Sequence, residues 1–229
     1  IPDGQLVLGS TAVTSTAAEL NLLDDKDATH LAVPGKLEGT NFSESLLVGH
    51  TTTGTLNAAE KNTGVGTTAL QAITSGDRNT AIGAGAGKTL TYSSFNTALG
   101  VDSLTKVCGN SNTSIGNGSG SNTTGAGNIY LGKDAGNNIT SGSGNVVIGV
   151  ADVASATGDD QLKISDGEDG SVVWITGDSS GNLTFGGTIT IGSATVTEAQ
   201  LEVLDGATVT TTELNLIDGG TARGTTAVA

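Results

Sequence analysis

A glycine that follows an aliphatic residue recurs seven times along the middle of the chain, and this period constrains the fold more than any other feature. Successive copies are 16 or 17 residues apart. The glycines are Gly49, Gly66, Gly83, Gly100, Gly116, Gly132 and Gly149. So short and regular a period is typical of a solenoid, in which each repeat buries its apolar face only against its neighbours. The sequence therefore predicts a stack of about seven coils.

The composition agrees with thin stacked coils. The 229 residues include 36 Gly but only six aromatic residues, namely three Phe, two Tyr and one Trp. This mixture is too poor in large side chains for one large core, yet its apolar residues recur in register, which disfavours disorder. We predict a mainly all-β chain that folds as a parallel β-roll or β-solenoid.

Each coil opens with a short strand after an asparagine, as in Asn-Thr-Ala-Ile-Gly at 79–83 and Asn-Thr-Ala-Leu-Gly at 96–100. Alternation with a period of two places Thr and the aliphatic residue on one face and a small residue on the other. We expect the aliphatic face to point into the coil. There it would meet a second apolar column seven residues after each glycine. That column is Leu56, Ile73, Leu90, Val107, Thr123, Ile139 and Ala156.

The opposite face is small in the middle coils, where it carries Ala81, Ala98 and Ser114. An interior of about two aliphatic side chains per coil offsets little of the chain entropy, which is roughly 1–2 kcal/mol per residue. Small side chains allow several copies to approach closely. We therefore expect this face to form the interface of a parallel homo-oligomer, a homotrimer.

The recurring asparagine before each strand predicts a stacked amide ladder that satisfies backbone groups in the turns. Ordered Thr columns can also bind ice or glycans. Against that hypothesis, the Thr column becomes Ile129 and Val146 in later coils.

A second motif flanks the repeat region three times, as a Thr followed three residues later by Glu or Gln and then by a Leu-rich segment. This is a capping-box signature for a short helix. We expect these helices to pack against other copies as collars through Leu20, Leu23, Leu201, Leu204, Leu214 and Ile217.

These patterns divide the chain into four parts. Residues 1–44 are predicted to hold a strand and a short-helix collar, and residues 45–157 the β-roll. Alternating apolar residues between turns predict a small β-domain at 158–192. Residues 193–229 are predicted to hold two further collar repeats and a flexible tail.

Charge and cysteine content exclude several classes of protein. The net charge is −14, and no basic patch exists to neutralise phosphates, which disfavours nucleic acid as a partner. No apolar run is long enough to cross a membrane, so we expect no membrane insertion. The single cysteine, Cys108, cannot form an intrachain disulfide.

Candidate catalytic and metal-binding groups are few. Paired carboxylates can hydrolyse glycosides, but Asp159-Asp160 and Glu168-Asp169 are more typical of solvated turns. Asp24, Asp25 and Asp27 form a third acidic cluster. His30 and His50 lack a second ligand at metal-binding spacing. We therefore predict no enzymatic activity, no cofactor and no metal.

The Asn-Thr-Ala-Ile-Gly coils resemble the head repeats of trimeric autotransporter adhesins, which form a trimeric left-handed parallel β-roll, over roughly residues 45–152. The Ala-Glu-Leu-Asn-Leu-Leu-Asp segment at 18–24 and the stretch from Trp174 to Asn182 resemble segments of bacteriophage tail-fibre proteins. The second resemblance implies a homotrimeric virion appendage. It also implies other tail or baseplate proteins as partners, and a host surface glycan or protein as receptor.

Three functional hypotheses follow. The first is a structural and adhesive segment of a trimeric tail fibre, located in the virion tail. The second is a bacterial cell-surface adhesin or extracellular filament subunit. The third is a tailspike that degrades polysaccharide, which predicts a carboxylate pair in a groove lined with aromatic residues.

Overall fold

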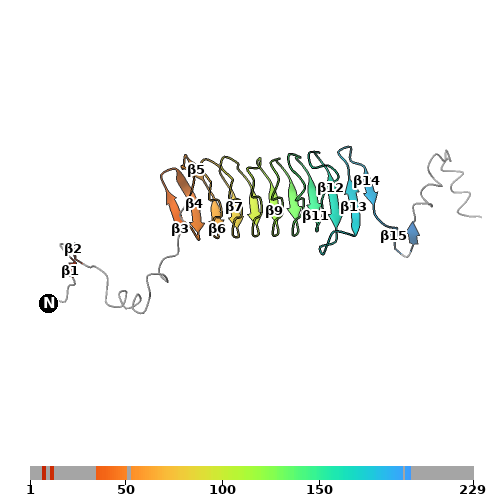
Figure 1. Ribbon diagram of the computed structural model, residues 1–229, viewed down its shortest axis with the longest axis horizontal. Coiled ribbons are helices and arrows are strands. Elements are labelled where there is room, and N and C mark those ends of the chain that lie inside the picture. Colours follow the sequence, from red (N-terminus) through yellow and green to blue (C-terminus); the bar gives the residue numbers. More distant parts are fainter. Residues whose placement is uncertain (1–6, 9–10, 13–34, 51–52, 193, 197–229) are drawn as a thin grey trace, which may run out of the picture. The chain divides into compact units, whose positions relative to one another are not determined.

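The computed structural model describes residues 7–8, 11–12, 35–50, 53–192 and 194–196. In this part the chain is all-β, without a helix. Its main feature is a 12-stranded sheet whose central strands are stacked and parallel. Together with the loops that close each coil, these strands form a β-solenoid of about seven turns, as the repeat predicted (Figure 1).

Eight strands form the parallel part of the sheet, and each pairs in register with the same positions of the next coil. Thr63 lies opposite Thr80, and Ala81 opposite Ala98. The strands are β4 (Phe42–Val48), β6 (Thr63–Val65), β7 (Thr80–Ile82), β8 (Thr97–Leu99), β9 (Thr113–Ile115), β10 (Ile129–Leu131), β11 (Val146–Ile148) and β12 (Leu162–Ser165).

Antiparallel strands close the sheet at both ends. At the N-terminal end, β3 (Gly35–Gly39) pairs with β4, which also pairs over a short stretch with β5 (Ala59–Glu60). At the C-terminal end, β13 (Val173–Gly177) pairs with β12, and β14 (Leu183–Phe185) follows it in the sheet. The strands expected between residues 158 and 192 are therefore present, and β12 to β14 continue the sheet of the solenoid.

The described residues outside this sheet form two small hairpins. β1 (Val7–Leu8) pairs with β2 (Thr11–Ala12), and β15 (Ile189–Ile191) pairs with β16 (Ala194–Val196). The second hairpin belongs to a separate compact unit that begins at Thr184. The predicted helical collars over residues 16–24 and 197–218 lie outside the described residues.

The orientation predicted for the strands is wrong. Ala81, Ala98 and Ser114 are fully buried inside their own chain, whereas the aliphatic residues beside them face outward. Ile82 and Leu99, for example, are 41% and 42% exposed. The small residues therefore line the interior of the coil, and the larger ones cover its outer surface.

The cross-section of the coil explains this orientation. The loop that closes each coil carries large side chains into the interior, where Leu70, Ile73, Leu90, Leu104 and Ile139 are fully buried. Little room remains opposite them. A Cβ on Gly64 would contact the side chains of Leu47 and Leu70. The inward strand residue is therefore small in the coils whose interior the loop side chains fill, and it is larger at Leu47, Tyr130 and Val147, which are also fully buried.

The second apolar column is confirmed in most coils. Ile73, Leu90, Thr123 and Ile139 are fully buried. Val107 is an exception, because it is 51% exposed while the neighbouring Cys108 is buried.

One coil places an aromatic ring in the interior. Tyr130 is fully buried at the position that Ser114 occupies in the preceding coil. Its ring fills the space above Gly120 and Gly136, where an added Cβ would overlap it. The Tyr130 hydroxyl lies 2.8 Å from the Thr123 hydroxyl, so its polar end is satisfied. Burial raises the pKa of Tyr130 well above its usual range.

The repeated glycines hold the coils close together. Their φ angles lie between 98° and 139°, a region that side chains rarely adopt. A Cβ on Gly100 would overlap the carbonyl group of Gly116 in the next coil. The glycines whose period identifies the solenoid therefore also form the column along which neighbouring backbones pack most tightly.

The predicted amide ladder is present. The Oδ1 atom of Asn96 accepts hydrogen bonds from the backbone N–H and the side-chain Nδ2 of Asn112, at 2.9 and 3.1 Å. The same pair of bonds links Asn112 to Asn128, and Asn128 to Asn145. These asparagines are fully buried, so each amide links one coil to the next by hydrogen bonds that are shielded from water.

Candidate interaction surface

The outward face of the parallel strands is the most regular surface in the described part of the chain. Each of the eight strands contributes two outward residues, because alternate side chains of a strand point to opposite faces. We call this surface the ladder face. It comprises Leu46, Val48, Thr63, Val65, Thr80, Ile82, Thr97, Leu99, Thr113, Ile115, Ile129, Leu131, Val146, Ile148, Leu162 and Ile164.

The ladder face is apolar and carries no charge. All of its members are aliphatic residues or threonine. Several large side chains are more than a third exposed, with values of 37% for Val65, 45% for Ile129 and 46% for Leu131. Contiguous exposed apolar surface of this kind is typical of sites that contact another molecule.

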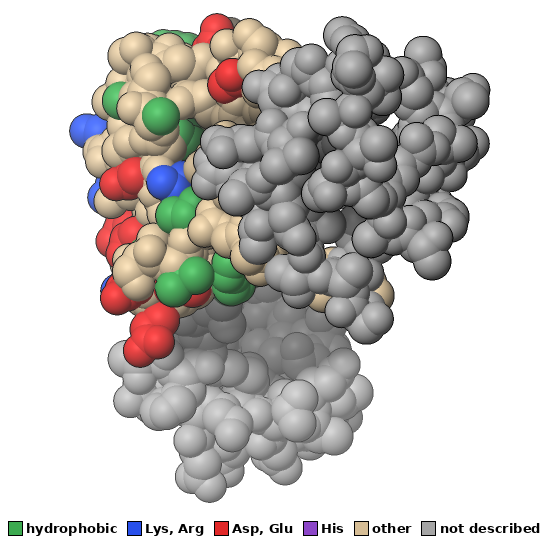
Figure 2. Space-filling view, turned by 90° about the vertical axis from the view of Figure 1, so that its right-hand side faces the viewer, with side chains coloured by type: hydrophobic (Ala, Val, Ile, Leu, Met, Phe, Trp, Pro, Cys, Tyr) green, Lys and Arg blue, Asp and Glu red, His purple; other side chains and the backbone are tan. Residues whose placement is uncertain are grey.

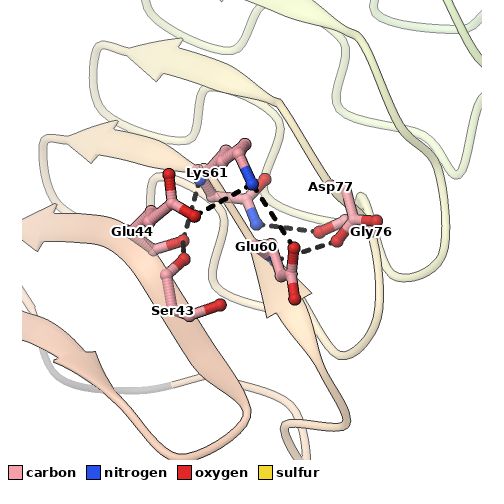
Figure 3. Close-up of polar contacts among 8 residues, drawn as sticks. Ser43, Glu44, Glu60, Lys61, Gly76 and Asp77 are labelled. Atoms are coloured by element: carbon pink, nitrogen blue, oxygen red, sulfur yellow. Dashed lines mark hydrogen bonds and ion pairs between the residues drawn. The ribbon is translucent and has the colours of Figure 1, made fainter.

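Among the described residues, one group of charged side chains lies at a corner of a coil. Figure 3 shows this corner near the N-terminal end, where the Lys61 ammonium lies 3.0 Å from the Glu44 carboxylate and 3.5 Å from that of Glu60. The backbone N–H of Glu60 in turn donates to Asp77 Oδ1 at 2.8 Å. Glu44 raises the pKa of Lys61, by a hydrogen bond and by its charge. Exposed ion pairs like these stabilise a fold little.

The sequence-predicted interface residues divide into two groups. Ala81, Ala98 and Ser114 are buried inside their own chain and have no surface to offer another copy. Leu20, Leu23, Leu201, Leu204, Leu214 and Ile217 lie outside the described residues. The sequence pattern predicts the aliphatic column of the ladder face but places it in the interior, whereas the structure places it on the surface. Asn and the small residue share one face of each strand, and a buried amide column would have indicated which face points inward.

In the described residues, aspartates of the acidic segments accept hydrogen bonds from backbone N–H groups. Asp159 Oδ1 accepts the N–H of Ser143 at 2.8 Å. The Asp166 carboxylate accepts the N–H groups of Glu168, Asp169 and Gly170, each at 3.0 Å, and that of Val172 at 2.7 Å. These hydrogen bonds hold the pKa of Asp166 well below its usual range.

A shallow hollow of about 440 Å³ lies near the C-terminal end of the solenoid. Asp134, Asp152, Asp169 and Lys163 are among its lining residues, which include no aromatic side chain. Acidic side chains are the prevailing charged type on the described surface seen from this end (Figure 2). The hollow therefore lacks the aromatic lining that the tailspike hypothesis predicts.

Other candidate reactive groups are isolated. His50 makes a 2.6 Å contact from Nε2 to the Ala69 carbonyl oxygen, which requires the proton on that nitrogen. Cys108 is buried, and burial raises the pKa of its thiol to about 11. Among the described residues no group of three ligating side chains could hold a metal ion. That part of the chain likewise contains no helix that could span a membrane.

Comparison with known proteins identified no relative. No family model matches the chain, and no curated protein or solved structure is similar to it. Functional inference therefore depends on the ladder face and on the sequence patterns.

Proposed function

We propose that this chain is a structural and adhesive segment of a trimeric viral tail fibre. Its solenoid would form part of a stiff shaft that takes part in host-surface attachment, without enzymatic activity. The observation that carries this proposal is the ladder face, an uncharged apolar strip along the full set of parallel strands. With about 4.8 Å between strands, eight strands make a strip roughly 34 Å long.

Another copy of the same chain is the partner that best fits this strip. A second solenoid has the same spacing between strands, so its side chains match rung for rung. The column formed by the first outward residue of each strand also changes along the chain. After Leu46 it carries Thr63, Thr80, Thr97 and Thr113, and then Ile129, Val146 and Leu162. Copies that run in the same direction place threonine against threonine and aliphatic against aliphatic. We therefore propose parallel association.

The number of copies and the setting come from the resemblances. The coils resemble those of trimeric adhesin heads, and the flanking segments resemble those of tail fibres. Three narrow coils around a common axis would bury their ladder faces together, leaving the charged corners in water. The remaining partners in this proposal are other tail or baseplate proteins and a glycan or protein of the host surface.

Disulfide trapping tests the proposal. Thr63→Cys and Val146→Cys place a thiol on the ladder face near either end, while the native Cys108 stays buried. Under mild oxidation we expect each variant to link to itself, leaving one chain of each trimer unlinked. A mixture of the two variants should give no mixed product.

Tyr92→Cys is the matched control, because Tyr92 is 71% exposed on a loop away from the ladder face and should not link. Mixed Thr63–Val146 products would show antiparallel packing and refute the parallel arrangement. Chains that stay unlinked and monomeric would refute the fibre proposal as a whole.

A further inference from the structure

The residues at the two ends of the amide ladder differ from the residues in its middle. In the middle, each asparagine accepts two hydrogen bonds from the asparagine of the next coil. The two end positions carry other residues. From the N-terminal end, the ladder positions are Ser45, Asn62, Asn79, Asn96, Asn112, Asn128, Asn145 and Gln161.

Gln161 at the C-terminal end turns its amide back into its own coil. Like the asparagines, it donates to the preceding rung, from its backbone N–H and Nε2 to Asn145 Oδ1 at 2.9 and 3.1 Å. Its Oε1, however, accepts the backbone N–H of Ser155 at 2.9 Å, and its Nε2 also reaches the carbonyl oxygens of Ser155 and Gly158. The side-chain oxygen of Gln161 is therefore engaged within its own coil.

Ser45 ends the ladder at the other side with a hydroxyl. Its Oγ accepts the backbone N–H of Asn62 at 2.8 Å, as the Oδ1 of an asparagine would. Its own proton goes to the Ser43 carbonyl oxygen at 2.9 Å. Serine has no side-chain amide nitrogen. The first rung therefore contains no buried amide donor that would need an acceptor from a preceding coil.

We infer that Ser45 and Gln161 terminate the amide ladder and hold the two terminal coils closed. An asparagine at the first rung would have no preceding Oδ1 to accept from its Nδ2, and an asparagine at the last rung would have no following amide to donate to its Oδ1. Buried groups without partners are costly, and the end repeats of a solenoid already lack one neighbour. The two exceptional residues remove that cost where the stack is weakest.

Amide hydrogen exchange of the full chain tests this inference through Gln161→Asn. The shorter side chain keeps the bonds to Asn145 but cannot reach Ser155. We expect the Ser155 amide to exchange at least about tenfold faster, since it loses its only acceptor. The amides of Asn112 and Asn128, deep in the stack, should exchange at the wild-type rate.

Ser45→Ala provides the same test at the other end, where the Asn62 amide should lose protection while Asn112 keeps it. An unchanged rate at Ser155 and Asn62 would overturn the inference. Equal acceleration at every rung would also overturn it, because the two residues would then act on global stability and not on the ends. Both readouts are independent of how many chains associate.

Discussion

Each buried asparagine of the ladder serves two coils at once. Asn112 Nδ2 donates to Asn96 Oδ1 at 3.1 Å, and Asn112 Oδ1 accepts both the N–H and the Nδ2 of Asn128. Its loss leaves buried polar groups without partners on either side. The asparagine column therefore contributes to the stability of the stack.

Asn112→Ala should lower the free energy of unfolding by about 3 kcal/mol, because an unsatisfied buried group costs roughly 1–3 kcal/mol and more than one is created. Chemical denaturation at a fixed protein concentration measures this change. Asn117→Ala is the control. Asn117 is exposed, so its replacement should alter stability by less than about 0.5 kcal/mol. Equal effects of the two variants would contradict a role for the ladder.

The Asp166 turn predicts a specific dependence on pH. Four backbone N–H groups favour the ionised carboxylate, so its folded pKa lies well below the ordinary value of about 3.9. A depressed pKa contributes stability that is fully present above about pH 4. That contribution is lost as the pH falls toward the folded pKa.

An NMR titration of the Asp166 carboxyl carbon should therefore show ionisation well below pH 3.9. In Asp166→Asn, unfolding of the β12–β13 hairpin should lose this part of its acid sensitivity. A carboxyl group that titrates at or above its ordinary value would contradict the hydrogen bonding described for this turn.

At the scale of the coil, the glycine column allows the backbones of neighbouring coils to approach at the spacing of hydrogen-bonded strands. Gly100→Ala adds a Cβ that overlaps Gly116, at a φ of 137°. We expect a loss of roughly 3 kcal/mol or more from strain and overlap together. Gly167→Ala is the control, because a Cβ there meets no atom within 4 Å. Thermal unfolding of the two variants compares them, and a tolerated Gly100→Ala would argue against tight stacking.

The sequence predicts the strands of the solenoid but not which face of each strand points into the coil. The glycine period, the strands and the asparagine ladder could be predicted because each depends on local pattern and a constant repeat. The inward direction of Ala98 could not, because it depends on how much of the cross-section Leu70, Leu90 and their counterparts fill. Local pattern alone therefore places the ladder face in the core, and only the three-dimensional packing shows that it lies on the surface.

At the scale of the whole molecule, substitutions at two adjacent residues test folding and association separately. Ala98 is fully buried and Leu99 is 42% exposed on the ladder face. Ala98→Glu would bury an unpaired charge, so we expect it to prevent folding of the coil itself. Leu99→Glu should leave the β-solenoid intact but disrupt association, because it places a like charge on each facing copy.

Circular dichroism and sedimentation of both variants check this pair. Leu99→Glu is expected to retain β-structure with the mass of one chain. A Leu99→Glu protein that remains fully associated would show that the copies meet elsewhere. An Ala98→Glu protein that folds normally would contradict the assignment of the small residues to the interior.

The mass of the unmodified protein in solution, measured by sedimentation equilibrium over a wide range of dilution, tests the central claim most directly. Association through the ladder face predicts a particle of three chains that persists at low concentration. A single, fully folded chain at every concentration, with the apolar strip open to water, would contradict it.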